Sequence, residues 1–164
     1  MVNGEAKGML KAALNNLRNL MGEFQPFVIK NTWGRGEDAE GQKGNRPTMG
    51  SKVSILTDAA AEVEGEDTLA GLGWIVKKGK KCWTCRVQVR VKNFTKKCIH
   101  LFEMCAVVMA VKQMGQILGN ERVTVHVDNS ACVFALLKGT SKQKELRMLT
   151  QEVQRLMARH GALW

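Results

Sequence analysis

The segment HLFEMCAVVMAVKQMG, residues 100 to 115, constrains the fold of this chain more than any other stretch. Its apolar residues run almost without a break, so it predicts a helix buried over most of its circumference. A carboxylate, Glu103, lies in the first turn of this expected helix. Because desolvation penalises an ionised acid, something must compensate it: the helix dipole, a nearby Lys or Arg, or a metal ion shared with other acids.

The composition fits one ordinary domain of a protein that binds a polyanion. The chain has 164 residues, 45% of them hydrophobic, and a formal net charge of +10. No apolar run is both long and charge-free enough to span a bilayer, since Glu103 and Lys112 interrupt the best one. The polar start lacks the apolar region of a secretory signal. We therefore expect an intracellular protein, cytoplasmic or nuclear, with reduced cysteines and no membrane contact.

The positive charge is concentrated in one stretch that contains no acid. Trp83 and Phe94 are interleaved with its cations, which favours contact with a nucleic-acid backbone over simple solvation. The nucleic-acid-binding candidates in this stretch are Lys77, Lys78, Lys80, Lys81, Arg86, Arg90, Lys92, Lys96 and Lys97.

Three segments follow from the pattern along the chain. Residues 1–29 form an amphipathic helical connection segment, residues 30–51 a Gly-rich polar linker, and residues 52–164 the main domain. Within the first segment, residues 9–21 predict a helix that needs a surface to lie on. Its apolar face comprises Met9, Leu10, Ala13, Leu14, Leu17, Leu20 and Met21.

The main domain predicts an α/β fold in the order βββαβαα, with a mixed sheet and helices packed on it. Strands are expected at 52–61, 69–76, 82–94 and 122–128, and helices at 101–118, 129–139 and 140–161. Gly139 is the expected end of the second helix, and Thr140 with Gln143 has the spacing of a capping box for the third.

Three acids occupy special places in this scheme. Asp58 lies at the centre or exit of the first strand, Glu103 in the buried helix, and Asp128 at the end of the fourth strand. Taken singly, Asp58 could start a turn, Asp128 could cap a helix, and Glu103 could be stabilised by a helix dipole. If the first and fourth strands are neighbours, the three side chains converge, and a hard divalent cation such as Mg²⁺ or Mn²⁺ would relieve their repulsion.

The segments TDAAAEVEGEDTLAGLGWIV, HLFEMCAVVMAVKQM, VTVHVDNSACVFALLKG and LTQEVQRLMARHG carry a resemblance to a known family. Over residues 52–164 the chain resembles the ribonuclease H domain of reverse transcriptases, most closely that of tyrosine-recombinase (DIRS-like) retrotransposons. The 9–21 helix also resembles the segment that joins the polymerase and ribonuclease H parts of such elements.

The resemblance implies a ribonuclease H-like fold and hydrolysis of the RNA strand of an RNA–DNA hybrid with two Mg²⁺ or Mn²⁺ ions. It makes Asp58 the carboxylate that bridges both ions, Glu103 a ligand of the second ion that helps hold the attacked strand, and Asp128 a further ligand. Asn129 and Ser130 are expected to contact the backbone near the cut. A reverse transcriptase polymerase domain on the same polyprotein is the implied partner.

The chain departs from the family pattern in two places. The insertion EVEGED follows the first strand and adds acids near the site, as a solvated hairpin tip or as a modifier of metal affinity. A fourth acid should follow a fifth strand, yet the sequence stops at Trp164, where that strand should begin. We therefore expect a piece of a longer protein, with weak or no cleavage. The alternative is an inactive ribonuclease H-like module that binds RNA or a protein partner as a scaffold.

Four residues offer a competing metal site. Cys82, Cys85, Cys98 and His100 are all zinc-ligand types, but an offset of three in a strand places Cys82 and Cys85 on opposite faces. His126 alternates with strand valines and is expected to be a packed or edge residue. His160 lies at a helix C-terminus, where the dipole favours a cation. Neither histidine is expected to act as a catalytic base.

Overall fold

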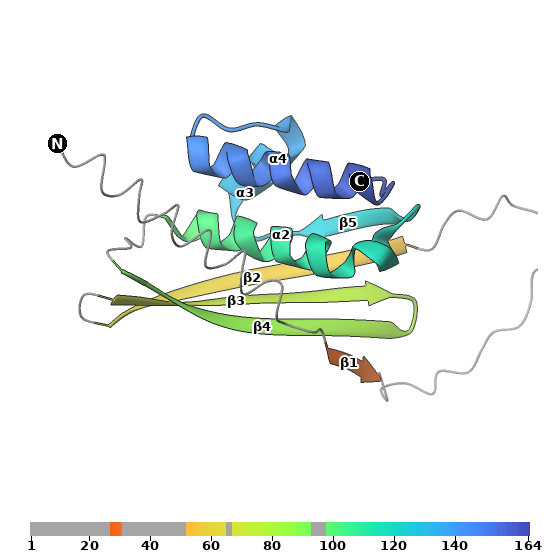
Figure 1. Cartoon of the computed structure of the whole chain (residues 1–164), viewed down its shortest axis with the longest axis horizontal. Helices are drawn as coiled ribbons and strands as arrows, with labels where there is room; N and C mark the ends of the chain where they lie inside the picture. Colours follow the sequence, from red (N-terminus) through yellow and green to blue (C-terminus); the bar gives the residue numbers. More distant parts are fainter. Residues whose placement is uncertain (1–26, 31–51, 65–66, 93–97) are drawn as a thin grey trace, which may run out of the picture.

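The computed structural model describes residues 27–30, 52–64, 67–92 and 98–164 (Figure 1). The strands are β1 (Phe27–Lys30), β2 (Lys52–Glu64), β3 (Asp67–Lys78), β4 (Lys81–Lys92) and β5 (Arg122–His126), and the helices are α2 (Ile99–Leu118), α3 (Ser130–Lys138) and α4 (Lys144–Arg159). Within residues 52–164, the expected order of three strands, a helix, a strand and two helices is confirmed.

The strands form one mixed sheet in the order β1-β4-β3-β2-β5. The pairs β2–β3, β3–β4 and β1–β4 are antiparallel, whereas β2 and β5 are parallel. The strands that carry Asp58 and precede Asp128 are therefore neighbours, as the convergence of the acids requires. The β5 strand is short, and its last residue, His126, pairs with Leu56. Beyond that point β2 continues without β5 beside it.

Helix α2 is buried because it lies between the sheet and the other helices (Figure 1). It contacts β2, β3 and β5 on one side and α3 and α4 on the other. This explains its nearly continuous apolar sequence, in which Leu101 to Val111 are all buried. Contrary to the sequence expectation, α2 is long and apolar enough to cross a membrane, although 78% of its apolar window is buried inside the fold. The core helix of a water-soluble fold meets the same criterion.

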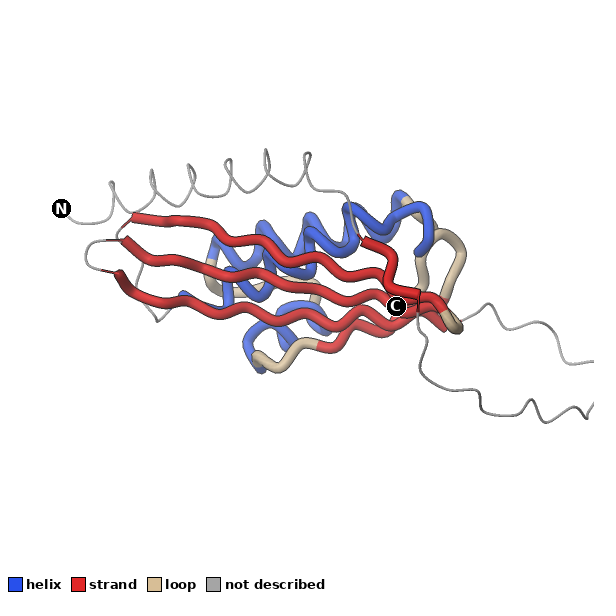
Figure 2. Tube along the Cα trace, turned by 90° about the horizontal axis from the view of Figure 1, so that it is seen from below, coloured by secondary structure: helices blue, strands red, loops and turns tan. Residues whose placement is uncertain are grey.

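The insertion after the first expected strand extends a hairpin. Strands β2 and β3 continue to Glu64 and Asp67, which pair with each other, so the insertion lengthens both strands. The β3–β4 hairpin turns at Gly79, whose φ of +57° is a left-handed conformation that glycine adopts without strain. As a result, three long strands run well past the end of β5 (Figure 2).

The ends of the outer helices agree with the sequence in one case and not in the other. Gly139 ends α3 in the left-handed conformation, as predicted. The predicted capping box of α4 is wrong, because the helix begins at Lys144 and Gln143 occupies its N-cap without a side-chain cap. The backbone N–H of Gln143 donates to Ser141 Oγ, and its side chain bonds His100 Nε2 at 2.5 Å. Gln143 thus ties the start of α4 to the start of α2.

Two short segments add to the sheet at its edges. The β1 strand, which was not predicted, pairs with β4, and its sequence FVIK has the β-branched and aromatic residues typical of strands. At the other edge, Leu163 makes a parallel bridge to Arg122. The backbone N–H of Val123 donates to Leu163 O at 2.7 Å. Leu163 therefore joins the sheet beside β5, whereas Trp164 is 48% exposed.

Candidate active site

Glu103 lies in the second turn of α2 and faces the core. The helix begins at Ile99, with Cys98 as its N-cap, and its first turn contains no acidic residue. The expectation that Glu103 lies in the first turn is therefore wrong. This weakens the helix-dipole explanation, because the dipole effect falls off within the first turn. Glu103 is only 6% exposed, so its charge needs another partner.

The surroundings of Glu103 disfavour its ionised form. Burial, the charge of Asp128, a side-chain hydrogen bond with Asp128 and the charge of Asp58 together raise the pKa of its carboxyl to about 7. A hydrogen bond from the Asn129 side chain acts in the opposite direction. Among the described residues no cation contributes to this pKa, and Oε2 of Glu103 is buried without a hydrogen-bond partner. The carboxyl group is therefore held protonated or awaits a cation.

Asp128 and Asn129 follow the end of β5 and have different roles: Asn129 caps α3, and Asp128 lies beside Glu103. Asn129 is the N-cap of α3, and its Oδ1 accepts from the N–H groups of Ala131 at 3.0 Å and Cys132 at 3.4 Å. The suggestion that Asp128 caps this helix is thus excluded. Asp128 is exposed and within hydrogen-bonding reach of Glu103. The amide of Asn129 serves both the helix and Glu103, a role that the sequence reading missed.

Contacts between helices hold these residues beside Glu103. The thiol of Cys132 donates to the backbone carbonyl of His100 at 3.0 Å, which fastens the first turn of α3 to the start of α2. Burial and the charges of Glu103 and Asp128 raise the pKa of this thiol to about 12, so it remains an S–H donor at neutral pH. Apart from an apolar helical face, no pattern along the chain predicts this contact.

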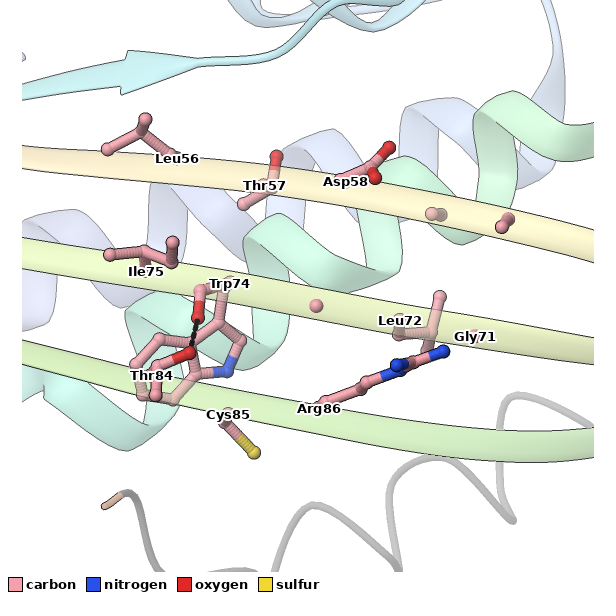
Figure 3. Close-up of a pocket in the computed structure, with 13 residues that line it drawn as sticks. Leu56, Thr57, Asp58, Gly71, Leu72, Trp74, Ile75, Thr84, Cys85 and Arg86 are labelled. Carbon is pink, nitrogen blue, oxygen red and sulfur yellow. Dashed lines mark hydrogen bonds between the residues drawn. The ribbon is translucent and has the colours of Figure 1, made fainter. Parts of the chain in front are cut away.

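Asp58 lies on β2 just past the last pair that β2 makes with β5. Figure 3 shows its carboxyl group pointing from β2 toward the side on which β5 ends. The preceding residue, Thr57, is buried and donates through Oγ1 to the backbone carbonyl of His126 at 3.5 Å. Asp58 is itself exposed. The early end of β5 therefore opens the edge of β2 at the position where the acid is needed.

The three predicted acids lie in one neighbourhood, with Asp128 and Glu103 the closest pair. In the part of the chain that the structure describes, however, no group of three or more His, Cys, Asp or Glu side chains is arranged to hold a metal ion as the side chains lie. The donor set still fits a divalent cation, because all three are hard carboxylate ligands and Glu103 has an unpaired buried oxygen. Asp58 and Asp128 are exposed and would need to turn toward Glu103.

The basic residues of the predicted nucleic-acid surface are divided among several places. Lys77, Lys78, Lys80 and Lys81 lie at the β3–β4 turn, where Lys78 pairs across the sheet with Val53. Val53 is five residues before Asp58, or about 17 Å at the rise of a strand. Lys78 is engaged locally, since its Nζ lies 2.8 Å from Glu121 Oε1 and donates to Ile117 O at 3.3 Å.

One arginine, Arg86, lies level with Asp58 in the sheet. Arg86 and Arg90 are on the exposed face of β4. Arg86 pairs across the sheet with Gly73, which pairs in turn with Asp58. Lys92 ends β4 at the open end of the β3–β4 hairpin, opposite the turn, while Lys96 and Lys97 lie outside the described residues. Ser130 is the exposed first residue of α3, beside Asn129.

The competing zinc site finds no support in the residues that the structure covers. Cys82, Cys85, Cys98 and His100 belong to no metal-holding group there. Cys85 faces the core of the sheet, with a pKa raised by burial, while Cys82 lies on the other face. His126 is an exposed residue at the end of β5, and His160 caps the C-terminus of α4, both as expected.

Comparisons with known proteins agree with this architecture. The model of the reverse transcriptase-like family matches residues 57–161. No curated protein sequence matches the chain. Among solved structures, the N-terminal ribonuclease H domain of a Mycobacterium tuberculosis protein, fused to maltose-binding protein, is similar at a TM-score of 0.54 and 16% identity, covering 69% of this chain and 78% of that one.

A second solved structure gives the same result. LC11-RNase H1, isolated from compost by a metagenomic approach, is similar at a TM-score of 0.50 and 18% identity, covering 66% of this chain and 77% of that one. Identities this low establish the fold alone, and that fold is the α/β ribonuclease H-like fold. Together with the family match, which spans Asp58, Glu103 and Asp128, they lead to one conclusion. The chain belongs to the reverse transcriptase-like family and has a ribonuclease H-like domain.

Proposed function

We propose that this domain hydrolyses the RNA strand of RNA–DNA hybrids with two divalent cations, Mg²⁺ or Mn²⁺. One observation carries the proposal: the carboxyl group of Glu103 is buried beside Asp128 and Asp58, with no described cation to balance it. If this position served only to pack the core, an apolar residue would be expected there, since burying an unpaired acid is costly. An acid kept at such a position is typical of a functional site.

The three acids would hold the metal ions from different elements. Glu103 supplies a fixed ligand from α2, while Asp58 on β2 and Asp128 after β5 supply ligands on the solvent side. When bound, the cations would activate a water molecule against the phosphorus atom and stabilise the leaving 3′ oxygen. Glu103 must give up its proton to bind, so the Asn129 amide, which donates to its carboxylate, helps metal uptake.

The residues around the acids would position the hybrid. Ser130 and Asn129 lie at the start of α3 beside Asp128, where they can contact the attacked backbone. Arg86 and Arg90 lie on the exposed face of β4, and the turn lysines at the far end of the sheet extend the positive surface. Contacts to 2′-hydroxyls in the wide minor groove would distinguish the RNA strand from DNA.

The experiment that tests this proposal is cleavage of a hybrid labelled on its RNA strand. We expect Mn²⁺- or Mg²⁺-dependent cleavage of the hybrid, and none of the matching DNA duplex. Asp58→Asn should abolish the cleavage, whereas Glu145→Gln, a change of equal charge on α4, should leave it unchanged. Cleavage that survives Asp58→Asn or chelation would refute the proposal.

A second candidate is an inactive module that binds RNA or a protein partner. The observation in its favour is that the described acids do not surround an ion as they lie. Salt-dependent binding of the hybrid without cleavage in either metal would support this candidate. In that case Asp58→Asn should leave the binding affinity unchanged or raise it, because it removes a negative charge.

We further propose that the domain is the ribonuclease H part of an intracellular reverse transcriptase from a tyrosine-recombinase type retrotransposon. The family match and the sequence resemblance support this, and the expected partner is a polymerase domain on the same polyprotein. Extension of the coding sequence upstream is the test. A reading frame without polymerase motifs would argue against this setting while leaving hybrid cleavage untouched.

A further inference from the structure

The sheet face turned away from α2 carries a depression of about 610 Å³ (Figure 3). Among the described elements every helix lies on the other side of the sheet (Figure 1, Figure 2). The depression spans β2, β3 and β4, and Gly71 and Gly73 of β3 are among the residues that line it. Leu56 is half-buried there, and Ile75 is 37% exposed. On this face the apolar side chains of Leu56 and Ile75 therefore lie beside Gly71 and Gly73, which have no side chains and form the floor of the depression.

Neither the backbone conformation nor the described neighbours of Gly71 and Gly73 require glycine at these positions. Neither has a positive φ. A Cβ added at Gly71 would meet nothing within 4 Å, and one added at Gly73 would come no nearer than 3.8 Å to another atom. Glycine inside a strand costs about 0.5–1 kcal/mol relative to Ala, and it commonly marks a place where another backbone approaches closely. The empty floor thus points to an occupant above it.

The chain itself brings a suitable segment to this place. Strand β1 pairs with β4 so that its first residue, Phe27, lies beside Thr84. Thr84 lines the depression. Phe27, the first described residue, therefore lies at the edge of the depression. Only residues 22–26 separate Phe27 from the amphipathic segment 9–21, and they can span at most about 18 Å.

We infer that residues 9–21 form a helix that docks on this face, over Gly71 and Gly73. Thirteen helical residues are about 20 Å long, and the sheet from β4 to β2 is about 10 Å wide, so the tether allows the contact. The apolar face of the segment, from Met9 to Met21, covers Leu56 and Ile75. The glycine floor lets the helix approach closely. Asp58 and Arg86 also line the depression, so the docked helix lies beside both. The carboxyl of Asp58 points away from it, toward the edge beyond β5 (Figure 3).

The test compares variants of the full chain for which the expected change in melting temperature has opposite signs with and without the docked helix. On a bare face, Gly71→Val should raise the melting temperature, because Val is a better strand residue and meets no atom there. With the helix in place, the added side chain displaces it and lowers the melting temperature. Ser54→Val, on the same face of β2 but outside the depression, is the control and should not destabilise.

Amide hydrogen exchange identifies the occupant directly. We expect the amides of residues 9–21 to exchange at least about tenfold more slowly than in an unstructured chain. Leu17→Asp, on the apolar face, and Gly71→Val should each abolish this protection, while Asn15→Asp, on the polar face, should preserve it. Unchanged protection in β2 to β4 confirms that each variant is folded.

Three outcomes would overturn the inference. Residues 9–21 could show no protection, or Gly71→Val could raise the melting temperature. Protection that disappears on dilution, together with a larger species in sedimentation, would instead assign the face to a second copy of the chain.

Discussion

At the scale of single residues, the pairing of Glu103 with Asp128 sets the chemistry of the site. Burial and two neighbouring carboxylates raise the pKa of Glu103 to about 7, whereas an unfolded Glu titrates near 4.5. Between these values the folded state binds more protons than the unfolded state. The free energy of unfolding of the metal-free protein therefore falls as pH rises through this window, and is greatest below it.

This predicts a specific pH dependence of stability in the presence of a chelator. The free energy of unfolding should fall by about 1–3 kcal/mol between pH 4.5 and pH 7.5, because each unit of pKa shift is worth about 1.4 kcal/mol. Glu103→Gln, which cannot ionise, should flatten this decrease. Denaturant titrations across the range measure it. Equal slopes in both proteins would show that Glu103 is not the titrating group.

Asn129 allows its two roles to be separated. Asn129→Ala removes the cap of α3 and should lower the free energy of unfolding by about 1 kcal/mol. Asn129→Asp keeps a capping oxygen but loses the amide donor to Glu103, so stability should change less, while the pKa of Glu103 rises further. Ser130→Ala, one residue later, is the control. Identical pH profiles for Asn129→Asp and the unmodified protein would contradict the role of the amide.

At the scale of elements, the sequence predicted most of the architecture, because hydrophobic period and glycine position determine it locally. The buried α2, the alternating β5 and the end of α3 at Gly139 all follow from such patterns. The start of α4 does not follow from a local pattern, because the Gln143 side chain forms a hydrogen bond with His100, a residue 43 positions away. Likewise, the strand β1 depends on pairing with β4, which no local pattern reveals.

The contact between α2 and α4 gives an element-scale prediction. The His160 ring, at the end of α4, lies against Gly115 of α2, where an added Cβ would collide with it. Gly115→Ala should therefore destabilise by about 1–2 kcal/mol. In a His160→Ala background the same change should be neutral or stabilising, since Ala favours a helix over Gly by about 1 kcal/mol. Denaturant unfolding of the four proteins measures this coupling. Additive effects would mean that the ring does not occupy this space.

At the scale of the whole molecule, the site exists because β5 stops early beside β2. The sequence predicted that Asp58, Glu103 and Asp128 would converge if the first and fourth expected strands were neighbours, and β2 and β5 do pair. It could not predict that Asp58 and Asp128 would be exposed while Glu103 is buried, because that depends on how α2 and α3 cover the sheet. It also could not show that the turn lysines lie at the far end of the sheet, because that follows from strand register.

The most direct test of the central claim is calorimetric titration of Mn²⁺ into the full chain at pH 6.5, where Glu103 is mostly protonated. If Asp58, Glu103 and Asp128 form a cation site, Asp128→Asn should weaken binding by about tenfold or more, since affinity follows the number of charged ligands. Glu145→Gln should bind like the unmodified protein. Binding should also release protons, seen as a dependence of the heat on the buffer, because Glu103 ionises on metal uptake. Equal affinity in all three proteins, or no binding at millimolar Mn²⁺, would contradict the account.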